Sequence, residues 1–271
     1  MDNTPYLMRG LYKGTGTTAA PASTSRYLND ARIRDWVSTH MLRRSEKDLP
    51  THTDPYQLHL LLMEVQDLGR IEELFTEARR QWPDLDRWLS EKFISTYTRN
   101  DLLACPPGSL GAALGKYVVE NNFELDIIAR FEPKTQYDYY RIRSAQTHDL
   151  EHIVGGGGFD ILGELVPYYI RLTNIFKFLP AELAGEVSVL QVFGSMRILA
   201  RTALHYPQSW LAALDTVQRG IRVGLESGPL FMAKYEDALH LPIAQARELL
   251  GVVGAVDVDT RAASHEWDEY E

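Results

Sequence analysis

Apolar side chains recur every three or four residues along most of this chain, which is the spacing of helices that bury one face. The stretch after Pro55 is the longest case and carries Leu58, Leu61, Leu62, Val65, Leu68, Phe75 and Ala78. We expect one amphipathic helix there, ended by Pro83, and a second helix over residues 85–93.

The helical periodicity continues almost to the end of the chain. Further periodic stretches cover residues 111–121, 137–155, a segment capped by Asp160, 182–204, 209–235 and 241–249. Strand signals such as residues 123–128 are short and isolated. The sequence therefore predicts an all-α fold that forms a single compact multi-helix domain.

The two ends of the chain differ in composition from the middle. Residues 13–25 combine Gly, Thr, Ser and Pro with almost no large apolar side chains, and residues 256–271 carry one basic and six acidic side chains. We expect a flexible leader over residues 1–25, a helical domain over 26–251 and a solvated acidic tail over 252–271.

The composition excludes several classes of protein. A formal net charge of −9 argues against a general nucleic-acid binder, which needs clustered Lys and Arg to neutralise phosphates. A hydrophobic content of 45% is enough for a large core and excludes wholesale disorder. The single cysteine, Cys105, cannot form an internal disulfide, so we expect a reducing compartment.

No membrane-spanning helix is expected. The longest run without charged residues, 102–115, is interrupted by Pro106 and Pro107 and is too short to cross a bilayer. The first residues resemble neither a secretory signal nor a transit peptide. We expect a cytoplasmic protein, or one that lies peripherally on the cytoplasmic face of a membrane.

Candidate chemistry is concentrated in the segment HDLEHIVGGGGFDILGE, which contains His148, Asp149, His152 and Glu164. Two histidines four residues apart project from one helical face, so both imidazoles can reach one divalent cation. The glycines at 155–158 should end that helix, and a reversal after them would return Glu164 to the same point. These residues predict a metal site with two imidazole and two carboxylate ligands.

Several features of this site stay open at the level of sequence. Asp149 lies about 100° round the helix from His148, so it could bind the ion or instead orient an imidazole. Zinc is the first expectation, while iron, manganese, cobalt and magnesium remain alternatives. A hydrogen-bonded His–Asp pair without any metal is the simplest alternative. Glu151, on another face of the helix, is expected to be a solvated surface residue.

The pattern HDLEH-x11-E, preceded by PPGSLG at 106–111, resembles the hallmark motif of the Coq4 family of ubiquinone biosynthesis proteins. The segment SWLAALDTVQRGIRVGLESGPLFMAKYEDALHLPIAQARELLG at 209–251 is similar to the C-terminal region of that family. The likeness covers residues 49–251. It departs from the family at Ala145, at Glu151 and in the run of four glycines.

The resemblance implies a helical fold, with metal ligands at His148, Asp149, His152 and Glu164. It also implies a role late in coenzyme Q assembly: removal of the C1 carboxylate, with oxidative hydroxylation, from a polyprenylated 4-hydroxybenzoate head group. We expect the four ligands to be catalytic. Arg143 is the candidate for pairing with the substrate carboxylate, and an ordinary surface arginine is the alternative. The expected partners are a prenylated benzoate, quinone intermediate or isoprenoid lipid, other coenzyme Q biosynthesis proteins, a membrane surface and a second copy in a homodimer.

The prenyl tail needs an apolar groove, for which residues 161–170, 187–199 and 225–232 offer apolar stripes. Arginines that could meet head groups or a pyrophosphate are Arg197, Arg201, Arg219 and Arg222. Two other functions remain open. One is a non-catalytic scaffold or carrier of prenyl lipid, in which the metal is structural. The other is an HD-type phosphohydrolase, which would need further ligands such as His52 with Asp54 or His205 with Asp215.

Overall fold

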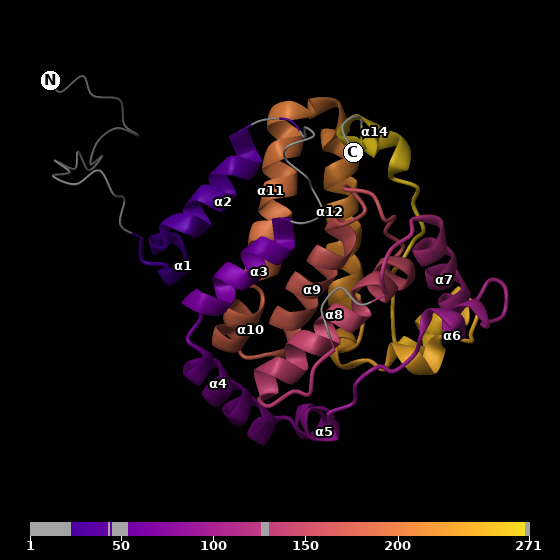
Figure 1. The fold of residues 1–271 in the computed structure, drawn as a ribbon, viewed down its shortest axis with the longest axis horizontal. Helices are drawn as coiled ribbons and strands as arrows, with labels where there is room; N and C mark the ends of the chain where they lie inside the picture. Colours follow the sequence, from indigo (N-terminus) through magenta and orange to yellow (C-terminus); the bar gives the residue numbers. More distant parts are fainter. Residues whose placement is uncertain (1–22, 43, 45–53, 126–129, 269–271) are drawn as a thin grey trace, which may run out of the picture.

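The computed structural model describes residues 23–42, 44, 54–125 and 130–268, and these form helices joined by turns (Figure 1). The α-helices are α1 Arg26–Asn29, α2 Ala31–Leu42, α3 Asp54–Val65, α4 Leu68–Gln81, α5 Pro83–Glu91, α6 Arg99–Leu103, α7 Leu110–Glu120, α8 Gln136–Gly155, α9 Leu165–Phe178, α10 Ala181–Val187, α11 Val189–His205, α12 Trp210–Glu226, α13 Ile243–Leu250 and α14 Arg261–Asp268. Three short 3-10 helices lie at Pro207–Ser209, Leu230–Met232 and Tyr235–Ala238. These residues contain no strand, so the all-α prediction is confirmed.

Three of the expected helices are divided or shorter. The stretch after Pro55 forms α3 and α4, because Asp67 accepts a hydrogen bond from the Arg70 amide and starts a new helix. Helix α4 ends at Gln81 with its C-cap at Trp82, directly before Pro83, and Pro83 then opens α5 at a position where its missing N–H costs nothing. The expected helix over 182–204 is likewise two helices, α10 and α11, and that over 209–235 stops at Glu226.

The centre of the molecule consists of α8 and α9, with α12 packed along α9 (Figure 1). Glycines make this close approach possible. A Cβ at Gly220 would lie 2.7 Å from the carbonyl oxygen of Val166, and one at Gly224 would lie 2.6 Å from that of Ile170. The α9–α12 contact therefore fixes the helix that follows the glycine turn.

The expected leader lies almost entirely outside the described residues, and α1 begins at Arg26. The segment expected as a solvated tail packs back onto the domain instead. Val252, Thr260 and Ser264 are buried, and Val258 donates a backbone hydrogen bond to Gly156. Residues 252–264 therefore belong to the folded unit, close to the glycine turn.

Among the described helices, none is by itself both long enough and apolar enough to cross a membrane. Helices α10 and α11 reach that length and composition only as a pair, and they are bent by 61° at the break between them.

Candidate metal centre

Helix α8 carries the two histidines, and both of its ends are set by local sequence. At the start, Thr135 and Asp138 form a capping box in which each side chain accepts from the backbone of the other. At the end, Gly156 adopts the left-handed conformation with φ of 81°. The helix thus stops one turn after His152.

The glycine turn then reverses the chain. Asp160 does cap this turn, because its Oδ1 accepts from the amides of Leu162 at 3.2 Å and Gly163 at 3.1 Å. The regular helix begins later than expected, at Leu165, with Glu164 at its N-cap. Glu164 therefore stands at the end of the turn that faces α8.

His148, His152 and Glu164 come together at one point. The His148 Nε2 atom lies 3.5 Å from Glu164 Oε2, and His152 Nε2 lies 3.4 Å from Glu164 Oε1. One ligand atom from each of the three residues lies within 4.8 Å of the others. One carboxylate thus faces two imidazole nitrogens, an arrangement that could hold a cation.

The tautomers of both histidines suit metal binding. His152 Nδ1 lies 2.8 Å from the carbonyl oxygen of Gly158, so this nitrogen carries the proton and donates it. Its Nε2 is left with a lone pair, is buried, and makes no hydrogen bond within the described part of the chain. A bound cation would provide the partner that this buried acceptor, which lies beside a carboxylate, does not find among the described residues.

Asp149 contacts the other side of the His148 ring. Its Oδ1 lies 3.0 Å from His148 Nδ1, which leaves Nε2 directed at Glu164. The structure thus gives three converging side chains, with Asp149 orienting one of them. Two histidines, one carboxylate and an open position match the donor set of catalytic zinc sites.

The electrostatics of the site favour a positive charge. Burial opposes protonation of His148, but hydrogen bonds to Asp149 and Glu164 outweigh it and raise its pKa to about 10. Burial would raise the pKa of Glu164, yet the two imidazoles hold it well below its usual value. A divalent cation could supply the positive charge that these carboxylates otherwise draw from a protonated His148.

A cavity of about 470 Å³ opens beside this cluster and is lined by His148, Asp149 and Glu164. Two of the three stripes expected to line a groove contribute to it, residues 161–170 and 187–199, whereas no residue of 225–232 does. The aromatic side chains in its wall are Tyr56, Tyr137, Tyr140 and Tyr168. His148, Asp149 and Glu164 therefore lie in the wall of a partly open cavity that is also lined by aromatic side chains.

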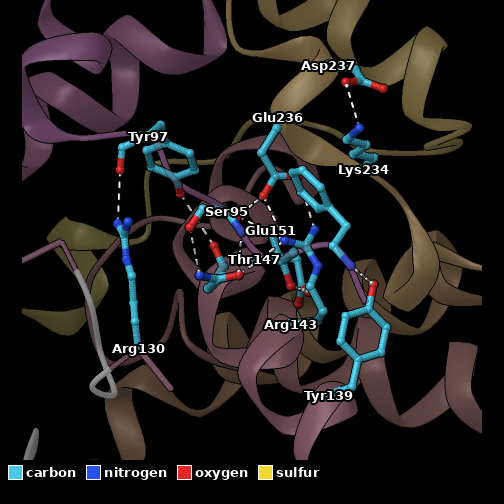
Figure 2. A network of polar contacts seen from close by, with 12 residues as sticks. Ser95, Tyr97, Arg130, Tyr139, Arg143, Thr147, Glu151, Lys234, Glu236 and Asp237 are labelled. Carbon is cyan, nitrogen blue, oxygen red and sulfur yellow. Dashed lines mark hydrogen bonds and ion pairs between the residues drawn. The ribbon is translucent and has the colours of Figure 1, made fainter. Parts of the chain in front are cut away.

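Arg143 lies elsewhere, in the polar network of Figure 2. Its side chain is only 2% exposed, and its two Nη atoms bind Glu236 at 2.8 and 3.1 Å. It also donates to Ser95 Oγ at 2.8 Å, and it does not line the cavity. In this structure Arg143 joins α8 to the segment containing Glu236, whose carboxylate takes the place we expected for a substrate carboxylate.

Glu151 is not a solvated surface residue, and that prediction is wrong. It is 3% exposed, and its carboxylate oxygens lie 2.6 Å from Arg171 Nε and 3.1 Å from Arg171 Nη2. Thr147 donates to it at 2.8 Å. The face of α8 that carries Glu151 turns toward α9, and a partner twenty residues away was not visible in the local pattern.

The four arginines proposed for head groups separate into two pairs. Arg197 and Arg201 are buried, and Arg197 lines the cavity. Arg219 and Arg222 instead form surface ion pairs with Asp215 and Glu226, one turn along α12. Of these four arginines, Arg197 is therefore the one that could meet a ligand in this cavity.

Sequence reasoning missed Arg171, Tyr168 and His59, all of which line the cavity. The sequence could have indicated two of them by their spacing. Tyr168 and Arg171 follow Glu164 by four and seven residues and therefore share its face of α9. His59 comes from α3, far away in sequence, and nothing local marks it.

The ligands that a phosphohydrolase would need are not assembled here. His205 Nε2 contacts the carbonyl oxygen of Met41 at 2.9 Å, and Asp215 is paired with Arg219. His52 lies outside the described residues. Neither His205 nor Asp215 lines the cavity.

Comparison with known proteins agrees with the motif. The profile of the family described as "Coenzyme Q (ubiquinone) biosynthesis protein Coq4" matches residues 90–255. Among solved structures, the chain is similar to a "putative ubiquinone biosynthesis protein" from Nostoc punctiforme PCC 73102, with a TM-score of 0.60 and 19% identity over 81% of this chain and 94% of that one. At that identity the likeness shows the fold alone. No curated protein matches. Because the family profile covers more than half of the sequence and includes all of the convergent ligands, the chain belongs to the Coq4 family of ubiquinone biosynthesis proteins.

Proposed function

We propose that this protein binds a divalent cation through His148, His152 and Glu164, with zinc as the first candidate. The observation that carries the proposal is the buried Nε2 of His152, which is oriented by Gly158 and faces a carboxylate that also approaches His148. Asp149 would act by orienting His148 through its contact with Nδ1.

We further propose that the protein, with its cation bound, replaces the C1 carboxylate of a polyprenylated 4-hydroxybenzoate head group by a hydroxyl group. The ring carbon loses carbon dioxide and gains one oxygen atom, so dioxygen and a two-electron donor must be supplied, and the second oxygen atom leaves as water. A bound divalent ion supplies a Lewis acid that polarises a substrate oxygen. The membership of the family supports the pathway, and the cavity beside the cluster supports a ligand of this size.

The side chains of the cavity have separate tasks in this proposal. The tyrosines provide flat walls for an aromatic ring, and Leu62, Val187 and Leu190 provide apolar surface for the start of a prenyl chain. Enclosure of the ring excludes water and strengthens the electrostatic interactions inside. The longer part of the tail would leave the cavity toward a membrane surface or a partner protein of the same pathway.

The test uses the purified protein loaded with zinc. Metal content is measured by mass spectrometry, and turnover of a prenylated 4-hydroxybenzoate is followed under oxygen with a reductant. His152→Ala should lose the metal and the activity, whereas His240→Ala, at an exposed position, should keep both. A His152→Ala variant that stays folded and retains stoichiometric metal would contradict the proposed site.

A second function, a non-catalytic scaffold or prenyl-lipid carrier of the biosynthetic complex, shares the same metal site. It is favoured by the cavity, which could hold a lipid without any reaction. If the protein binds metal and lipid but does not convert the substrate in the presence of oxygen and a reductant, this result would support the non-catalytic role and reject the enzymatic one.

A further inference from the structure

Arg171 occupies an unusual place in the cavity wall. Its side chain is only 11% exposed and yet lines the cavity. Its Nε and Nη2 atoms donate to Glu151, and Nη2 also donates to the carbonyl oxygen of Ser144. The remaining donor, Nη1, makes no hydrogen bond within the described residues, and the side chain that carries it lines the cavity.

The contacts of Arg171 make it rigid. A guanidinium bound in two places by one carboxylate and in a third by a backbone carbonyl cannot turn away from the cavity. Its direction is fixed before a ligand arrives, so binding costs little side-chain entropy. Glu151 is held in turn by Thr147, one turn earlier on α8.

The position of Arg171 relative to the metal centre follows from the helix. Glu164 and Arg171 are seven residues apart, so they lie on one face of α9, about 10 Å apart along its axis. A helical side chain leans toward the N-terminus of its helix, which is the end of α9 that carries Glu164. Tyr168 lies between them on the same face, and all three line one cavity.

The charges of the cavity favour an anion once a cation is bound. Its lining contains three arginines, Arg141, Arg171 and Arg197, and three carboxylates, those of Asp149, Glu164 and Glu186. With Glu151, the counter-charge of Arg171, the carboxylates exceed the arginines by one, and a divalent ion turns this into one net positive charge. An anionic ligand then restores neutrality in a space of low polarity.

We infer that Arg171 is a substrate-binding residue, which donates from Nη1 to the ring hydroxyl of an aromatic acid whose carboxylate lies at the metal centre. This inference rests on the proposed function. The inferred contact requires a ligand with oxygen groups at opposite ends of one ring. The tyrosines of the cavity wall offer flat surfaces against which such a ring can pack. An acid without the ring hydroxyl keeps its contact with the metal centre and loses only the contact with Arg171.

The experiment compares two ligands on the full chain loaded with zinc. One is 4-hydroxybenzoate with a short prenyl group, and the other is the same acid without the hydroxyl. Both ligands are also tested on the variant Arg171→Lys, which keeps a positive charge beside Glu151 but lacks the Nη1 donor. We expect calorimetry to show about a tenfold loss of affinity for the hydroxylated acid and less than a twofold change for the other, with unchanged metal content. Arg219→Lys, at a surface ion pair, is the matched control and should change neither affinity.

Two results would overturn the inference. If Arg171→Lys weakens both acids equally, or neither, while the wild type binds both, Arg171 does not recognise the hydroxyl, and the proposed metal site still stands. If the wild type binds metal but neither acid, the proposed substrate fails and the inference fails with it. If Arg171→Lys does not fold, the double variant Glu151→Gln with Arg171→Gln, which keeps the shape of the pair without its charges, takes its place in the same comparison.

Discussion

Gly163 lies directly against Gly158, so closely that a Cβ at Gly163 would lie 2.6 Å from the carbonyl carbon of Gly158. The oxygen of the same carbonyl group accepts a hydrogen bond from His152 Nδ1. The close approach of two glycines therefore connects the turn geometry to the tautomer of a proposed metal ligand.

We predict that Gly163→Ala weakens zinc binding by about tenfold or more, because the displaced Gly158 carbonyl no longer orients His152, and such outer contacts are worth about 10–100-fold in affinity. Competition with a chromophoric chelator measures the dissociation constant. Gly185→Ala is the control, since a Cβ there meets nothing within 4 Å and replaces a helical glycine by a better helix former. An unchanged dissociation constant for Gly163→Ala would show that the turn does not orient the site.

Glu151→Gln should destabilise the protein by about 3 kcal/mol, because it leaves the buried guanidinium of Arg171 without its counter-charge. Urea unfolding of the metal-free protein measures the free energy of unfolding. Glu226→Gln removes one member of an exposed pair with Arg222 and should cost less than about 1 kcal/mol. Equal effects of the two substitutions would mean that the Glu151–Arg171 pair is as well solvated as a surface pair.

The sequence was sufficient for the fold class and for the family, because both depend on local patterns. Helical periodicity marks most elements, and the spacing from His148 to Glu164 places four chemically suited side chains around one glycine turn. The break between α3 and α4 was not predicted because apolar spacing continues across it, and only the cap at Asp67 reveals the new start.

The contacts that local patterns did not reveal include those of charged residues whose partners are distant in sequence. Glu151 looked solvated because its neighbours are polar, but Arg171 comes from the next long helix and neutralises it. Arg143 was expected at a substrate, but Glu236, ninety-three residues later, already binds it. Periodicity gives the face of a helix, and tertiary packing decides what covers that face.

The C-terminal segment should contribute to the stability of the glycine turn. Thr260 and Ser264 both donate to the carboxylate of Asp160, which also accepts from the Leu162 and Gly163 amides. We predict that Ser264→Ala costs about 1–2 kcal/mol, since Ser264 is fully buried and its removal leaves Asp160 with one partner fewer. In the Asp160→Ala background the same substitution should cost much less, and a double-mutant cycle of unfolding free energies measures this coupling. Additive costs would show that the hydroxyl does not act through Asp160.

Acid should destabilise the protein through His40, which is buried on α2 beside the ring of Trp36 at 4.5 Å between centroids. Burial, together with the charges of Arg197 and Arg201, lowers its pKa from 6.5 to about 4. Between these values the unfolded chain binds a proton that the folded chain does not, so stability falls as the pH drops from about 6.5 toward 4.

Above pH 6.5 both states hold His40 neutral, and its contribution no longer depends on pH. His40→Gln removes the titration, so the difference in unfolding free energy between the two proteins should be constant above pH 7 and should shift by about 1–3 kcal/mol in favour of the variant by pH 4.5. Metal-free protein is used for both, since protonation also releases a bound cation, and tryptophan fluorescence follows the transition. His59 carries a pKa lowered in the same direction, and it cancels in the difference because it is present in both proteins. A difference that stays constant through pH 4.5 would mean that folding leaves the pKa of His40 near 6.5, with the ring in contact with water rather than enclosed against Trp36.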